Sequence, residues 1–259
     1  MPSAAEYVSS KFVKLVLIGN SGAGKTGALL SLAQAGYRLR ILDLDNGLAA
    51  LINHAKAADP KLLSLIDYMS FRDQVKMTPA GPKVMNARAL TKSLAALDKW
   101  EDGSDPSTWG EDTVLVIDSL TMLSKYALQW SEFSNPAFKD RRLWYGPAQT
   151  VIEDTIANLT SDSFATNVIV ISHIDMREQK DGTIKGFAMT VGEALGPKIP
   201  IYFNNLVLSE PTGTGANVKR TLKTLPTSVL DLKNAAPMKI AATYPIETGL
   251  AEIFKALKS

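Results

Sequence analysis

With 259 residues, the chain is long enough to bury one substantial hydrophobic core, so we expect a single domain with an N-terminal arm (1–12), a core (13–210) and a C-terminal β and helical extension (211–259). A net charge of +2 gives no global sign of a polyanionic partner, and the lack of cysteine excludes disulfides and thiolate metal sites. No stretch approaches the ~18 apolar residues of a membrane-spanning helix, so we expect a cytoplasmic protein without membrane contact.

The first predicted elements flank a phosphate-binding loop. The apolar run 13–18 is typical of a buried strand, and a helix is predicted to follow the loop. Between them, GNSGAGKT matches the pattern G-x-x-x-x-G-K-[ST]. Its residues, with the glycine that follows, are Gly19, Asn20, Ser21, Gly22, Ala23, Gly24, Lys25, Thr26 and Gly27. Backbone N–H groups of such a loop surround a polyphosphate, and the helix start adds partial positive charge. Lys25 would reach the β- and γ-phosphates of ATP, and the Thr26 hydroxyl would bind Mg²⁺.

A second strand, 37–43, ends in two acids one residue apart. Alternation places Asp43 and Asp45 on the same side, near the carboxyl edge where ligands bind in open α/β sheets. We expect Asp45 to orient the attacking water and Asp43 to support Mg²⁺ or the phosphate loop. The alternative is that residues 45–47 are only a turn after the strand.

The middle of the chain predicts a short strand at 68–71, a loop at 78–82 and an amphipathic helix at 86–100. The next strand, 113–117, is continuously apolar apart from its first residue and ends in Asp118, the pattern of the carboxylate that holds Mg²⁺ in P-loop NTPases. Ser119 stands where many such ATPases have a catalytic glutamate. A water-activating carboxylate must therefore come from another strand.

The strand 167–171 precedes His173 and a polar segment, 176–190, and residues 202–208 return the chain to the sheet. Strand and helix signals thus alternate along the chain. This alternation predicts an α/β fold with a mostly parallel central sheet flanked by helices.

The order of these motifs resembles the RecA/RadA-type recombinase ATPase core. The resemblance implies a RecA-like P-loop NTPase fold, ATP and Mg²⁺ as cofactors, and a γ-phosphate sensor at His173, where the family has Gln or Asn. It also implies that Lys233, in the segment 232–237, reaches the nucleotide of a neighbouring subunit. Asp45 is one methylene shorter than the glutamate of bacterial RecA, and the His173 imidazole can change protonation. Both differences predict slow ATP hydrolysis.

The compact chain is most similar to the phage-encoded Sak-type single-strand annealing ATPases. That similarity implies ATP-dependent binding of single-stranded DNA, DNA recombination by annealing, and a homo-oligomeric filament or ring with ATP between subunits. It further implies DNA-stimulated ATP hydrolysis, a single-strand-binding protein as an additional partner, and the host cytoplasm as the location.

Two segments carry the residues expected to contact DNA. Segment 131–146 interleaves basic and aromatic residues, and segment 176–190 is polar and contains glycine. Such mixtures suit single-stranded DNA, because cations neutralise phosphates and rings stack on bases. The expected contacts are Lys139, Arg141 and Arg142 in the first segment and Arg177, Lys180 and Lys185 in the second. Each segment could equally be a solvated turn.

Three other functions remain open. The first is a RecA-fold ATPase switch that acts on protein partners, as a helicase loader or a clock-like protein does. The second is a small-molecule phosphotransferase, for which Arg141 and Arg142 are the candidate lid. The third is a nucleotide-binding module that does not hydrolyse ATP.

Overall fold

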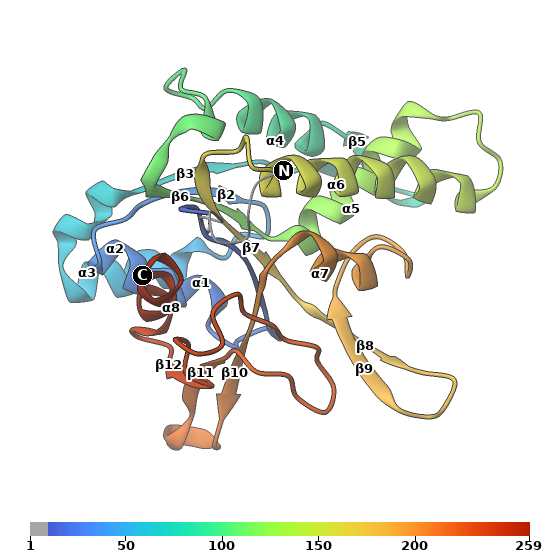
Figure 1. Ribbon diagram of the computed structural model, residues 1–259. Helices are drawn as coiled ribbons and strands as arrows, with labels where there is room; N and C mark the ends of the chain where they lie inside the picture. Colours follow the sequence, from blue (N-terminus) through green and yellow to red (C-terminus); the bar gives the residue numbers. More distant parts are fainter. Residues whose placement is uncertain (1–9) are drawn as a thin grey trace, which may run out of the picture.

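The computed structural model describes residues 10–259, so most of the expected N-terminal arm lies outside the described residues. Eight strands form one sheet in the order β12-β11-β10-β1-β7-β6-β2-β3 (Figure 1). The strands are β1 (Lys14–Ile18), β2 (Arg38–Asp43), β3 (Ile66–Ser70), β6 (Gly110–Asp118), β7 (Thr166–Ser172), β10 (Asn205–Thr212), β11 (Lys219–Lys223) and β12 (Thr243–Pro245). The run from β10 to β3 is parallel, and β11 and β12 extend it with antiparallel pairs.

Helices cover both faces of this sheet (Figure 1). One face packs against α1 (Lys25–Ala28), α2 (Leu30–Gln34), α3 (Leu48–Ala58) and α8 (Gly249–Lys258). The other packs against α4 (Ala89–Asp98), α5 (Leu120–Ser134), α6 (Tyr145–Thr160) and α7 (Ile199–Tyr202). Short 3₁₀ turns are η2 (Pro60–Leu65), η3 (Pro106–Thr108), η4 (Arg141–Trp144), η5 (Gly196–Lys198) and η6 (Gly215–Asn217).

The alternation of side chains in β1 shows why this strand is apolar throughout. Leu15 and Leu17 belong to the core on the α1–α3 and α8 face, whereas Val16 and Ile18 belong to the core on the other face. All four are buried. Strands covered on both faces need continuous apolar runs, which is how the central strands could be recognised. The predicted α/β fold with a mostly parallel central sheet is confirmed.

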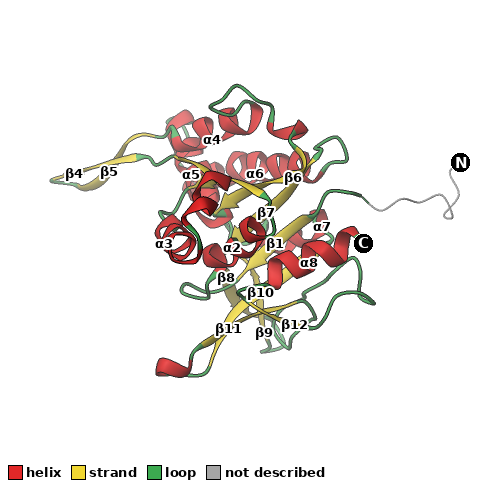
Figure 2. Ribbon diagram, turned by 90° about the vertical axis from the view of Figure 1, so that its left-hand side faces the viewer, coloured by secondary structure: helices red, strands yellow, loops and turns green. Residues whose placement is uncertain are grey.

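Two hairpins lie outside the main sheet. One is β4 (Gln74–Thr78) with β5 (Gly81–Asn86), and it projects from the body of the molecule (Figure 2). The other is β8 (Ile174–Glu178) with β9 (Ile184–Ala188). The expected loop at 78–82 is in fact the turn of the first hairpin and the strand residues beside it. The expected polar segment at 176–190 is mostly the second hairpin, because its backbone groups pair across the two strands.

Two predicted boundaries shift for local reasons. Helix α4 begins at Ala89 and not at residue 86, because the Asp73 carboxylate accepts the Ala89 N–H at 2.7 Å. The strand expected at 202–208 begins only at Asn205, because α7 continues to Tyr202. At the C-terminal end, α8 buries Phe254 completely, and its ring meets the Tyr37 ring edge-on at a centroid distance of 5.5 Å. Within residues 10–259, no helix combines the length and hydropathy that a membrane crossing requires.

Candidate nucleotide-binding site

The phosphate loop joins the end of β1 to α1. Gly22 and Gly24 have φ angles of 76° and 93°, which favour glycine. Their N–H groups have no hydrogen-bond partner among residues 10–259. The strand end is fixed by the Gly19 N–H, which donates to the Ser172 carbonyl of β7 at 3.2 Å. The loop is thus held at its start and presents free donors further along, as phosphate binding requires.

The Lys25 side chain folds back onto the loop that precedes it. Its Nζ donates to the carbonyl oxygens of Gly19 at 2.7 Å and Asn20 at 2.9 Å. Burial lowers the pKa of Lys25 below its usual value, while Asp118 and Asp45 act in the opposite direction. Phosphate oxygens could replace the two carbonyls as acceptors without moving the lysine out of the loop.

Three oxygen-bearing side chains surround Gly47, just after β2. A Cβ at this glycine would lie 3.1 Å from Asp45 Oδ1, 3.4 Å from Thr26 Oγ1 and 3.6 Å from Asp118 Oδ2. Thr26 Oγ1 donates to Asp118 Oδ2 at 2.7 Å. Asp45 Oδ1 is buried and has no hydrogen-bond partner among the described residues. Hydroxyl and carboxylate oxygens are the ligands that Mg²⁺ prefers, so Thr26 and Asp118 fit the predicted metal role and Asp45 lies beside them.

The electrostatic surroundings of Asp118 also favour a bound divalent cation. Burial, followed by the nearby Asp45 carboxylate, raises the pKa of Asp118 to about 7, although the Thr26 hydrogen bond opposes this. Carboxylates this close together repel, and a divalent cation would relieve that repulsion. No cluster of three His, Cys, Asp or Glu side chains suited to a metal occurs in residues 10–259. An ion here would therefore complete its shell with phosphate oxygens and water.

The sequence predicts that Asp43 supports Mg²⁺ or the phosphate loop, and in the structure its carboxylate is held in a network of hydrogen bonds. It is buried, and its carboxylate accepts the N–H groups of Asn46 and Gly47, the Ser70 hydroxyl and the Arg72 guanidinium. Asp43 accepts hydrogen bonds from all of these donors. It therefore fixes the loop that contains Asp45 and Gly47. The two acids do not share one function, although they are one residue apart.

His173 follows β7 and lies close to the same cluster. Its backbone N–H donates to Thr121 Oγ1 at 3.1 Å. Burial and, next, the Lys25 ammonium lower the pKa of His173 below its usual value, while Asp45 acts in the opposite direction. The imidazole is therefore neutral at pH 7. His173 therefore lies near enough to Lys25 and Asp45 for their charges to act on it, and its role as a γ-phosphate sensor stays a prediction.

The AAA domain family profile matches residues 11–236. The chain belongs to the AAA domain family. Its phosphate loop follows β1, which lies between β10 and β7 in the sheet.

Three solved structures are similar to this AAA domain. The RadB recombinase is 14% identical, with a TM-score of 0.47 and coverage of 83% of this chain and 80% of RadB. The flagellar accessory protein FlaH from Methanocaldococcus jannaschii is 12% identical, with a TM-score of 0.47 and coverage of 93% and 89%. A KaiC-like protein from Pyrococcus horikoshii OT3 is 12% identical, with a TM-score of 0.38 and coverage of 82% and 78%. No curated protein matches the chain.

The C-terminal strands of the AAA domain also contact the phosphate loop, through residues that the sequence motifs did not indicate. Arg220 of β11 donates from Nε to the Gly22 carbonyl at 3.0 Å. A Cβ at Gly24 would lie 2.7 Å from both Arg220 Cδ and Ile246 Cδ1. Ser209 of β10 donates to the Ala23 carbonyl at 2.8 Å. Residues 211–259 contain seven Lys or Arg against three Asp or Glu, and this excess of basic residues does not single out Arg220.

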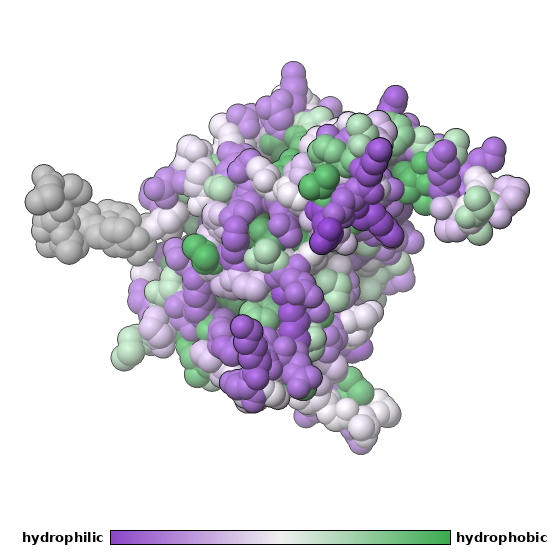
Figure 3. Space-filling view, turned by 90° about the vertical axis from the view of Figure 1, so that its right-hand side faces the viewer, coloured by the Kyte–Doolittle hydropathy of each residue, from purple (hydrophilic) through white to green (hydrophobic). Residues whose placement is uncertain are grey.

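The expected DNA contacts divide into exposed and internally paired residues. Lys139, Arg141 and Lys180 are exposed. Arg142 is also exposed but pairs with Asp140, and Lys185 pairs with Asp231 at 3.0 Å. Arg177 is largely committed within the chain, because it contacts Asp175, the Glu193 carbonyl and the Phe187 ring. On the face that carries both segments, groups of hydrophilic residues lie among residues of intermediate and hydrophobic character (Figure 3).

Lys233 lies away from the phosphate loop of its own chain. Its backbone forms an isolated bridge with Leu206, near the beginning of β10. The phosphate loop, in contrast, follows the far end of β1, which pairs with Leu208 of β10. The role of Lys233 at the nucleotide of a neighbouring subunit stays a prediction.

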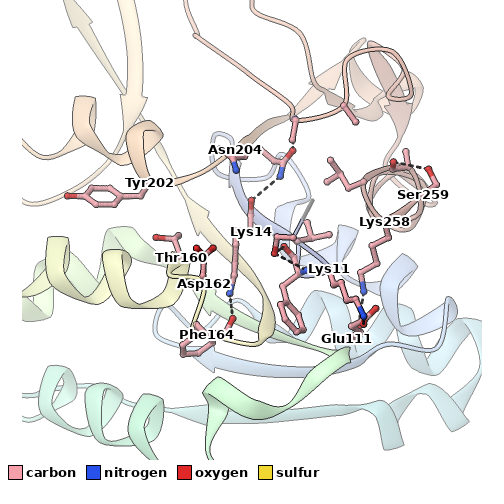
Figure 4. A pocket seen from close by; sticks show the side chains of 18 of the residues that line it. Lys11, Lys14, Glu111, Thr160, Asp162, Phe164, Tyr202, Asn204, Lys258 and Ser259 are labelled. Atoms are coloured by element: carbon pink, nitrogen blue, oxygen red, sulfur yellow. Dashed lines mark hydrogen bonds and ion pairs between the residues drawn. The ribbon is translucent and has the colours of Figure 1, made fainter. Parts of the chain in front are cut away.

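A cavity of about 630 Å³ lies at the opposite edge of the sheet, where the parallel strands begin (Figure 4). Lys14 points into it and donates from Nζ to the carbonyls of Phe164 at 2.7 Å and Thr166 at 2.8 Å. Burial lowers the pKa of Lys14 to about 7. Because every phosphate-loop residue lies at the other edge, this cavity is not the nucleotide site.

Proposed function

We propose that the protein is an ATPase of RecA-like fold that binds single-stranded DNA and acts in recombination by strand annealing, as the similarity to Sak-type proteins implies. The observation that carries this proposal is the convergence of Lys25, Thr26, Asp45, Asp118 and His173 at one edge of the sheet. A site of this composition can do more than hold phosphates, because it includes an unpartnered carboxylate.

In this proposal, each residue has a separate role. The loop amides from Gly22 to Thr26 hold the phosphates, and Lys25 neutralises the β- and γ-phosphates. Thr26 and Asp118 hold Mg²⁺, which supplies neutralisation of the charge on the transferred phosphoryl group. Asp45 would orient water for attack on the γ-phosphorus and accept its proton, while the bond from that phosphorus to the bridging oxygen breaks and ADP is the leaving group. His173 senses the γ-phosphate with a neutral imidazole.

The DNA part of the proposal is supported by charge at the surface. Lys139, Arg141 and Lys180 are exposed on segments that follow the Asp118 and His173 strands in the chain. Segment 176–190 begins three residues after His173, whereas α5 (Leu120–Ser134) connects Asp118 to segment 131–146. Assembly into a homo-oligomer, with Lys233 contributing to the neighbouring site, completes the proposal.

The test is ATP hydrolysis with and without single-stranded DNA, for the wild type and for Lys25→Ala. We expect DNA to stimulate turnover, and we expect Lys25→Ala to abolish both basal and stimulated turnover because it removes the phosphate-neutralising cation. Lys56→Ala, an exposed lysine of α3, is the control and should behave as the wild type. Turnover that ignores DNA, together with no DNA binding in the ATP-loaded state, would exclude recombination and favour a switch that acts on protein partners.

A further inference from the structure

The β4–β5 hairpin is an exposed arm without an assigned role. It projects from the body of the molecule (Figure 2), and no residue from Gln74 to Asn86 is buried. Met77 is 75% exposed and Val75 is 57% exposed. An isolated two-stranded hairpin is marginally stable in water, so exposed apolar residues on it are not explained by folding alone.

The pairing of the two strands separates the arm into two different faces. Val75 lies opposite Val84, and Met77 lies opposite Pro82. Between these pairs, Lys76 lies directly opposite Lys83, with its side chain on the other face. Like charges at directly opposed positions destabilise a hairpin. The arm therefore has one apolar face and one face on which two ammonium groups repel each other.

Charge around the arm is strongly one-sided. Residues 72–92 contain five basic residues (Arg72, Lys76, Lys83, Arg88 and Lys92) against one acid, Asp73, which gives 5 − 1 = +4. All five basic residues are exposed. Only Arg72 forms an ion pair among residues 10–259, with Asp43. An anionic polymer would remove the repulsion between Lys76 and Lys83, whereas a second copy of this chain has a net charge of +2, the same sign as the arm.

The combination of charged and apolar surface on the arm favours a single strand of nucleic acid over a double helix. The two lysines can meet phosphates, and the exposed methionine and valine side chains can contact base faces. In a duplex the base faces are stacked and covered, so the apolar face of the arm would have no partner. We propose that the β4–β5 hairpin is an arm that binds single-stranded DNA. This inference rests on the proposed function for the identity of the polymer.

The root of the arm is connected to the nucleotide site. Arg72, two residues before β4, donates to Asp43 Oδ2 at 2.9 Å. The other carboxylate oxygen of Asp43 accepts the N–H groups of Asn46 and Gly47. Gly47 in turn lies beside Asp45, Thr26 and Asp118. DNA on the arm can thus change the position of the 44–47 loop through one ion pair.

The first experiment compares Lys76→Gln/Lys83→Gln with Lys56→Gln/Lys61→Gln, which removes the same charge from exposed positions elsewhere. Binding to fluorescent oligothymidylate is measured by anisotropy, with Mg²⁺ and a slowly hydrolysed ATP analogue, over a range of salt concentrations. We expect at least about fivefold weaker binding for the arm variant and a salt slope smaller by roughly 1.4, since each lost phosphate contact contributes about 0.7 for a single strand. The control variant should match the wild type.

The outcomes separate this inference from the proposed function. A wild type that does not bind the oligonucleotide overturns both. Equal affinity and an equal salt slope for the wild type and the arm variant overturn the arm and leave the proposed function standing. Unchanged DNA binding with lost self-association, measured by sedimentation velocity, assigns the arm to a subunit contact and also overturns the inference.

The second experiment tests the connection through Arg72. Arg72→Gln breaks the ion pair with Asp43 but leaves Lys76 and Lys83 in place. We expect the ratio of DNA-stimulated to basal ATP turnover to fall towards one, while DNA affinity changes by less than about threefold because only one cation is lost. Wild-type stimulation in this variant would show that the connection does not operate.

Discussion

At the scale of single residues, Asp43 and Asp45 have opposite surroundings. Asp43 is saturated with hydrogen-bond donors, whereas Asp45 Oδ1 is buried without a partner among the described residues. A buried polar atom without a partner carries a free-energy cost. Its retention next to Thr26 and Asp118 is consistent with the proposed role in orienting water.

Replacement of Asp45 tests this role. We expect Asp45→Asn to lower kcat for ATP hydrolysis by roughly 10²–10⁴, the range for a general base. ATP affinity should change little, because Asp45 Oδ1 forms no hydrogen bond with the phosphate loop among the described residues. Asp45→Glu extends the carboxylate by one methylene and should retain turnover. If Asp45→Asn hydrolyses ATP like the wild type, residues 45–47 are only a turn.

The lowered pKa of Lys14 predicts that the free energy of unfolding depends on pH in the alkaline range. Burial lowers its pKa in the folded protein to about 7, from a usual 10.5. Between these values the unfolded chain binds a proton that the folded chain does not, so the free energy of unfolding rises as pH increases from 7 to 10.5 and the gain is absent below pH 7.

Lys14→Met should flatten this dependence, since it removes the titrating group. The measurement is urea denaturation at several pH values, with Lys11→Met, at an exposed neighbouring position, as the control. The contribution of Lys14 has a slope of at most about 1.4 kcal/mol per pH unit. Equal pH profiles for the wild type and Lys14→Met would contradict the prediction.

At the scale of elements, α8 completes the cover of one face of the sheet. Phe254 is fully buried and contacts the Tyr37 ring. We expect Phe254→Ala to lower the free energy of unfolding by about 3–5 kcal/mol, because it leaves a large cavity. Phe254→Leu should cost clearly less, as it fills part of that space. Chemical denaturation of both variants is the measurement, and a loss below about 1 kcal/mol for the alanine variant would show that α8 contributes little.

The elements also show what could be predicted from the sequence. Central strands were recognisable because burial on both faces leaves continuous apolar runs, as in β1 and β7. The β4–β5 arm could not be recognised as two strands, because no face of it is buried and Pro79 to Pro82 has the composition of a loop. Alternation of apolar and polar residues becomes a strand signal only where one face packs on a core.

The same distinction holds for the site. The phosphate loop and Asp118 could be predicted because their residues are contiguous or end a buried strand. Arg220 could not, since its contact with Gly22 joins residues 198 positions apart and no spacing rule connects them. Arg72 is similar, because its link to Asp43 depends on how β2 and β3 pair.

At the scale of the whole molecule, nucleotide binding should stabilise the fold. A ligand that binds only the native state at 100 times its Kd adds about 2.7 kcal/mol. For a chain of this size we expect Mg²⁺ with a slowly hydrolysed ATP analogue to raise Tm by roughly 5–10 °C. Differential scanning fluorimetry measures this shift. Lys25→Ala should lose it, and an equal shift for this variant would place the nucleotide elsewhere.

The strand order of the sheet also means that β1 is synthesised long before the two strands that pair with it. The phosphate-loop strand leaves the ribosome first, yet Lys14 pairs with Val168 and Leu15 pairs with Asn205. At 5–20 residues per second, roughly 10–40 s pass before both neighbours of β1 have been made. Until β7 has been made, both edges of this apolar strand lack their native partners, and one edge still lacks its partner until β10 follows. A chain released before β10 therefore contains the phosphate loop but lacks one strand beside β1 and the contacts of Ser209 and Arg220 with that loop.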